Sequence, residues 1–136
     1  MKKLLTLLAS LSLVACAGMM SEGETVNVKL SGAEEVPPAA TAGSGSGSFT
    51  LSRDGSVNGS VTTTGVQGTM AHIHHGARGA NGPVIVPLVK SGDTYSTPPG
   101  ARLNEAQIQA FRSGHLYVNV HSDRYKGGEV RAQLRL

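Results

Sequence analysis

The chain has 136 residues, with 12 Lys+Arg against 9 Asp+Glu, five histidines and a single cysteine. This length suits one domain, and a lone cysteine excludes a fold held together by internal disulfides. The formal net charge of +3 includes Lys2 and Lys3 near the N-terminus and is +1 without them, so the charge gives no support for nucleic acid or an anionic membrane surface as a partner.

The first residues, "MKKLLTLLASLSLVACAG", have the layout of a secretory signal peptide, with two lysines and then an apolar run from Leu4 to Val14. The run is shorter than the roughly 20 apolar residues of a transmembrane helix. Its ending "LVAC" resembles the bacterial lipobox, in which the cysteine is lipidated and begins the mature chain. We therefore expect a signal peptide over residues 1–15, lipidation of Cys16 and a tether over residues 16–24.

The lipobox likeness implies an exported lipoprotein at the periplasmic face of the outer membrane or at the cell surface. Its contact with the membrane would be through the lipid anchor only, because acyl chains on one residue suffice for stable anchoring. An ordinary cleaved signal peptide that leaves an unmodified cysteine is the alternative.

After the tether, apolar and polar residues alternate with the period of a β-strand. "TVNVKLSG" is the first such run, and "GSFTLSRDGSVNGSVTTTG" contains two more, joined by a hairpin signal at Asp54-Gly55. The runs "PVIVPLV", "HLYVNVH" and "EVRAQLRL", together with residues 70–75, bring the total to about seven strands. This spacing predicts an all-β fold over residues 25–136, a Greek-key β-sandwich or barrel.

One segment, "PPGARLNEAQIQAFRSGH", breaks the alternation. Asn104 can cap a helix with Gln107 three residues later, and Ile108 and Phe111 then fall on one helical face. Gly114 suits the C-terminal end. The segment therefore predicts one short crossover helix.

Three of the five histidines lie within four positions of one predicted strand. Because side chains alternate along a strand, His72 and His74 share a face, while His75 points to the other face at the strand's end. The paired residues are roughly 7 Å apart at Cα, so both rings can converge on one ion. Met70 has the same parity, and its thioether would favour Cu(I). Whether His75 takes part stays open.

The run "GHLYVNVHSD" adds two more histidines to a polar strand face. Leu116, Val118 and Val120 form its apolar face, which sends His115 and His121 to the opposite one. His121 ends the strand and supplies a third imidazole, and His115 is a further candidate. Three neutral imidazoles with an open position suit copper or zinc rather than the hard ions that prefer oxygen ligands. Histidines on the surface of an ordinary β-sandwich are the alternative.

Three stretches of the chain resemble the CHRD domain, the module named after the chordin repeats. They are "LSGAEEVPP", "AHIHHGARGANGPVIVPL" and "LYVNVHSDRYKGGEVRAQL". The family pattern of A-H-I-H, then Y-V-N-V-H, then G-E-I/V-R, carried over to this chain, selects His72, His74, His121, Gly128, Glu129 and Arg131. His75 and His115 are not part of that pattern.

The histidine arrangement is also distantly similar to that of copper/zinc superoxide dismutases, whose copper is held by an H-x-H strand pair and a later histidine at a strand end. The chain lacks their disulfide cysteines and their zinc loop, so copper without zinc is the closer analogy. We therefore expect copper, with zinc as the alternative, at His72, His74 and His121. Superoxide could react at the open position, attracted by Arg131 or Arg124.

Two other functions remain open at this point. One is a copper or zinc carrier without catalysis, and the other is a metal-free protein interaction module. The identity of the metal, any turnover and the oligomeric state do not follow from the sequence.

Overall fold

The structure is a computed structural model that describes residues 23–136. The expected signal peptide over residues 1–15, the lipidation site Cys16 and the tether up to residue 22 lie outside the described residues. Within residues 23–136, no helix is both long enough and apolar enough to cross a membrane.

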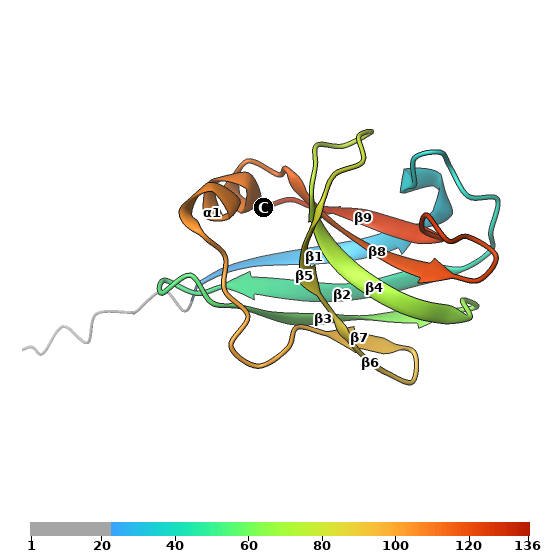
Figure 1. The fold of residues 1–136 in the computed structure, drawn as a ribbon, viewed down its shortest axis with the longest axis horizontal. Helices are drawn as coiled ribbons and strands as arrows, with labels where there is room; N and C mark the ends of the chain where they lie inside the picture. The colour runs from blue at the N-terminus through green and yellow to red at the C-terminus, as the bar shows by residue number, and fades with distance from the viewer. Residues whose placement is uncertain (1–22) are drawn as a thin grey trace, which may run out of the picture.

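The described chain folds into one antiparallel sheet of nine strands with a single short α-helix (Figure 1). In chain order the elements are β1 (Glu24–Ser31), the 3-10 turn η1 (Gly32–Glu34), β2 (Ser44–Leu51), β3 (Val57–Thr64), β4 (Gly68–His75), β5 (Val84–Pro87), β6 (Val89–Ser91), β7 (Thr94–Ser96), α1 (Glu105–Arg112), β8 (Leu116–Ser122) and β9 (Val130–Leu134). The strand order is β5-β4-β8-β9-β1-β2-β3-β7-β6.

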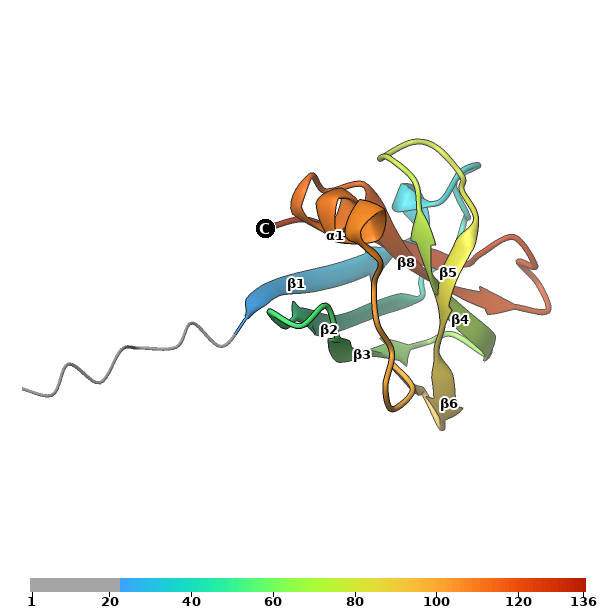
Figure 2. The same ribbon diagram turned by 60° about the vertical axis from the view of Figure 1, so that its left-hand side comes forward.

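This sheet curls into a nearly closed barrel, which confirms the expected all-β fold and decides between a sandwich and a barrel. β5 pairs with β4 at one end of the strand order, and β6 pairs with β7 at the other. Only Leu88 separates β5 from β6, so residues 84–91 join the two ends of the sheet (Figure 2). The Leu88 N–H also donates to the Ala71 carbonyl on β4, at 3.0 Å.

Two of the nine strands were not expected from the sequence. The run "PVIVPLV" is divided into β5 and β6, because Pro87 has no N–H with which to continue a ladder. The short β7 pairs with β3 and β6 over Thr94–Ser96, and a run of this length shows no readable alternation.

The inward-facing side chains form one continuous core made mostly of Val, Leu and Ile. The chain's two phenylalanines, Phe49 on β2 and Phe111 on α1, are fully buried in it. The strands contribute Val26, Val28, Leu30, Leu51, Val61, Ala71, Ile73, Val118, Val120, Val130 and Leu134. Because side chains alternate, the residues between these point away from the core, and the histidines of β4 and β8 are among them.

The helix forms where the sequence predicts it, between β7 and β8. The Asn104 side chain accepts a hydrogen bond from the Gln107 N–H, and the Gln107 side chain accepts one from the Asn104 N–H, both at 2.9 Å. This capping box satisfies donors that an exposed helix end would otherwise leave unpaired. Gly114, with φ of +72°, follows the C-terminal end, where a left-handed conformation favours glycine.

Candidate metal site

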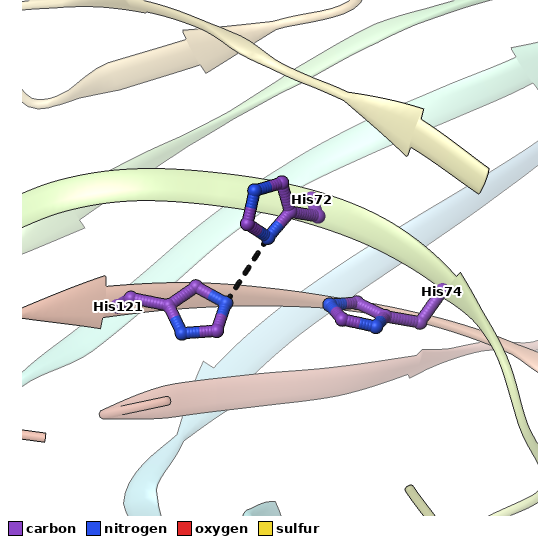
Figure 3. Close-up of side chains that lie close together, drawn as sticks. All are labelled: His72, His74 and His121. Carbon is purple, nitrogen blue, oxygen red and sulfur yellow. Dashed lines mark hydrogen bonds between the residues drawn. The ribbon is translucent and has the colours of Figure 1, made fainter. Parts of the chain in front are cut away.

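Three histidines from two neighbouring strands converge on the outer face of the barrel (Figure 3). β4 and β8 pair side by side, and their register sets Met70 opposite His121, His72 opposite Asn119 and His74 opposite Tyr117. One ring nitrogen from each of His72, His74 and His121 lies within 4.8 Å of the other two. The three imidazoles that strand parity placed on one side of the sheet therefore form a group that could hold a metal ion.

Backbone carbonyls fix the ring protons of two of these histidines. The His74 Nδ1–H donates to the Gly82 carbonyl at 2.9 Å, and the His121 Nδ1–H donates to the Lys126 carbonyl at 2.8 Å. A carbonyl only accepts, so the neutral form of either ring has its lone pair on Nε2. The His74 Nε2 atom is buried and has no hydrogen-bond partner.

The third ring, that of His72, turns its Nδ1 atom toward the other two rings. His72 Nδ1 lies 3.1 Å from His121 Nε2, and in the absence of a metal it donates its proton to that lone pair. For His72 Nδ1 to bind an ion, the proton must move to His72 Nε2. The group therefore offers two Nε2 atoms and one Nδ1 atom.

The environment of the group keeps two of its rings neutral. Burial lowers the pKa of His72 below the usual histidine value, and the neighbouring His121 and His74 add to that lowering. Burial also lowers the pKa of His74, opposed by the hydrogen bond to Gly82 and by the neighbouring Asn119 side chain. Neutral imidazole is the form that binds metals, so protons compete little for these nitrogens near neutral pH.

Met70 lies beside this group, and Arg124 follows the strand that carries His121. Met70 is opposite His121 in the strand register, and its side chain is 50% exposed. Arg124 follows β8 and is exposed, with its guanidinium 5.5 Å from the centre of the Tyr125 ring. Of the two arginines considered as anion guides, Arg124 is therefore the one that faces solvent.

The remaining two histidines lie outside the group. His75 is exposed and has the opposite parity to His74 on β4. His115 is also exposed and precedes the first residue of β8, whereas His121 is near the last. The register pairs His75 with Leu116, which places His115 at the far end of β8 from the convergent rings.

Arg131, the other candidate for attracting superoxide, is buried, with 1% of its surface exposed. Its guanidinium carbon lies 3.5 Å from the centre of the Tyr117 ring, and its Nη2 donates to the Ala77 and Ala80 carbonyls. Of the two candidate anion guides, Arg131 is therefore not at the surface, because β9 lies inside the sheet and the loop after β4 accepts hydrogen bonds from this side chain.

Two buried polar side chains next to the histidines carry unpaired atoms. Glu35, just after η1, and Asn119, on β8, are 3% and 2% exposed. Burial raises the pKa of Glu35 to about 7, against the opposing effects of the Asn119 amide and the Arg131 charge. Glu35 Oε1 and Asn119 Oδ1 have no hydrogen-bond partner. Both buried side chains lie on the outer side of the sheet, where Asn119 is opposite His72 in the strand register.

The role of Glu35 was not apparent from the sequence. It stands beside another glutamate in "AEEVPP", and nothing in the pattern separates Glu34, which pairs with Arg78 at the surface, from the buried Glu35. Gly128 faces the same carboxylate: a Cβ there would lie 2.4 Å from Glu35 Oε1, and the φ of +130° also favours glycine. The absence of a side chain at Gly128, the second glycine of "GGEVR", therefore makes room for Glu35.

Comparison with protein families matches the chain over residues 26–134 to a family described as CHRD domain. That range includes all three histidines, the loop that carries Gly82 and the closing hairpin with Arg131. The comparisons with curated proteins and with solved structures returned no match.

Proposed function

This chain belongs to the CHRD domain family, and from that premise and the histidine geometry we propose that it is a copper-binding domain. The observation that carries the proposal is the orphaned lone pair of His74. A buried acceptor without a partner costs roughly 1–3 kcal/mol. An ion bound between His74 Nε2, His121 Nε2 and His72 Nδ1 would remove that cost. The donor set therefore fits a metal ion.

The chemistry of the donors supports copper over the other common metals. The group contains three imidazoles and no carboxylate or thiolate, which disfavours calcium and magnesium. Imidazole binds copper and zinc well, and copper binds more tightly than zinc at a given nitrogen site. The exposed Met70 thioether, opposite His121, adds a soft donor at the rim that favours Cu(I). Zinc is the alternative ion.

Bound copper would supply one-electron chemistry, and we propose superoxide as the small substrate that reacts at this site. His72 and His121 are only partly buried, so a small solute can reach the rim of the group. Gly82 and Lys126 would keep two of the ring nitrogens aimed at the ion throughout such a cycle. Arg124 is the exposed cation that would attract the anion.

A second candidate function is copper transfer without turnover. The burial of Arg131 favours it, because only Arg124 of the two expected anion guides remains at the surface. The half-exposed Met70 favours it as well, since a soft ligand at the rim can pass Cu(I) to another protein.

We expect the full chain, purified without chelator or nickel resin and then loaded with copper, to retain about one ion per chain. Elemental analysis and the nitrogen hyperfine pattern of the Cu(II) electron paramagnetic resonance spectrum are the measurements. The variant H72A/H74A/H121A should retain none. The matched variant H75A/H115A also removes histidines and should load like the wild type. Equal copper retention in the triple variant would refute the proposed site.

Turnover separates the two candidate functions. If the copper-loaded chain dismutates superoxide, kcat/KM should approach the diffusion ceiling of about 10⁸–10⁹ M⁻¹s⁻¹ and should fall in Arg124→Ala. Stopped-flow decay of superoxide is the measurement, with the H72A/H74A/H121A variant as the blank. Copper binding with no decay above that blank would leave copper transfer as the function.

A further inference from the structure

Arg131 is a buried cation without an ion-pair partner in the described part of the chain. None of the ion pairs formed within residues 23–136 includes it. Its donors go instead to the loop after β4: Nη2 to the Ala77 and Ala80 carbonyls at 3.1 and 2.9 Å, and Nη1 to the Asn81 side chain at 3.4 Å. Burying a charge costs several kcal/mol, and the hydrogen bonds from Arg131 to this loop offset part of that cost.

The loop that Arg131 holds is the one that sets the protonation pattern of His74. Residues 76–82 return toward the end of β4 so closely that a Cβ on Gly82 would lie 1.7 Å from the His75 carbonyl oxygen. The Gly82 carbonyl thereby reaches His74 Nδ1. Gln133, the next outward residue on β9 after Arg131, fixes the start of the loop by donating to the Gly76 carbonyl at 2.7 Å.

A second path from Arg131 to His74 runs through an aromatic ring. β8 lies between β4 and β9, so Tyr117 is contacted by His74 from one neighbouring strand and by Arg131 from the other. His74 stacks on the Tyr117 ring, with centroids 4.6 Å apart and planes 4° apart. The Tyr117 hydroxyl also accepts from the Gly82 N–H at 3.0 Å. The three side chains form one continuous stack.

From these contacts we propose that Arg131 is a positioning residue for the metal site, and this inference rests on the proposed function. Through the loop it places the Gly82 carbonyl that holds the His74 proton on Nδ1. Through Tyr117 it fixes the plane of the His74 ring. Both effects direct the His74 Nε2 lone pair toward His72 and His121. Arg131 itself touches neither the ion nor a substrate.

The test measures the tautomer of His74 in the metal-free full chain by long-range ¹H–¹⁵N correlation spectra. Wild-type His74 should be protonated on Nδ1 alone. In Arg131→Gln, which lacks the charge and most of the donors, His74 should become a mixture of both tautomers. His121 is the internal control, because its proton is held by the Lys126 carbonyl and should not change. The exposed Arg135→Gln is the matched variant and should leave both rings unchanged.

Two milder variants keep the proposal testable if Arg131→Gln does not fold. Arg131→Lys retains the charge but loses the fork that reaches two carbonyls, and Tyr117→Phe retains the ring but loses the contact with Gly82. Both should show a smaller tautomer change than Arg131→Gln. A pure Nδ1-protonated His74 in folded Arg131→Lys and Tyr117→Phe would overturn the proposal.

Copper affinity provides the second readout. Loss of a group that orients a ligand lowers metal affinity by about 10–100-fold, so Arg131→Gln should fall in that range in a Cu(I) competition titration. Arg131→Lys should recover part of the loss. The tautomer measurement needs no metal, so a tautomer change in a chain that binds no copper would reject the proposed function and keep the positioning role. Normal copper binding with no tautomer change would reject the positioning role alone.

Discussion

Replacing His74 by alanine is expected to weaken copper binding by more than about 100-fold, because a lost ligand should cost more than the 10–100-fold lost with a group that merely orients one. His74 is the most buried of the three rings, at 7% exposure, and its free Nε2 has no other partner. The remaining His72 and His121 would hold the ion with two nitrogens only. A Cu(I) competition titration against a chromophoric chelator measures the change.

The neighbouring residue provides the control for this result. His75→Ala removes an imidazole one position along the same strand, but from the exposed opposite side. It should leave copper affinity within about twofold of the wild type, since surface substitutions away from a site have small effects. Similar losses for His74→Ala and His75→Ala would mean that copper binds the exposed histidines of this strand without selecting the convergent group.

The second large effect is a change in how the stability of the fold depends on pH, caused by Glu35. Burial raises the pKa of this carboxyl from 4.5 to about 7 in the folded chain. Between these two values the folded state keeps a proton that the unfolded state has released, so the free energy of unfolding falls as the pH rises through this window. The destabilisation caused by the buried, ionised Glu35 carboxylate is complete above about pH 7 and absent below about pH 4.5.

Glu35→Gln removes that destabilisation because the amide stays neutral at every pH. The variant should gain stability relative to the wild type on going from about pH 5 to about pH 8, by up to about 3 kcal/mol. Urea denaturation of both metal-free chains at the two pH values measures it, and shared titrations such as those of the histidines cancel in the comparison. Glu34→Gln is the matched control, because Glu34 is partly exposed and pairs with Arg78 at the surface. A stability difference that is the same at both pH values would contradict the assignment.

The sequence predicts well those features that depend on the period of a strand. Alternation assigns each histidine to a face, and the structure confirms the shared side of His72, His74 and His121. The same alternation cannot say which of His115 and His121 joins the pair, since both lie on the polar face of one strand. That choice depends on the register between β4 and β8, which sets Met70 opposite His121. Register follows from the way in which whole strands pack, so one strand's pattern does not contain it.

The burial of Arg131 and of Glu35, which the sequence did not reveal, involves the outer side of the sheet. Parity places Arg131 outside the core, and an outward residue is expected to be solvated. Instead, the loop of residues 76–82 covers it and accepts its hydrogen bonds. Glu35 is buried in the same way, on the outer side of the sheet and next to Asn119. Periodicity describes the two faces of a strand but not what later folds over them.

The segment that joins the two ends of the sheet has a consequence for any redox cycle at this site. Because β5 lies along one side of β4 and β8 along the other, the backbone that carries His72 and His74 is held by ladders on both flanks. Cu(I) and Cu(II) prefer different ligand geometries, yet ligands on such a strand cannot slide to follow the change. A copper ion bound there would have to accept the geometry that the barrel provides, which would lower the reorganisation energy of electron transfer.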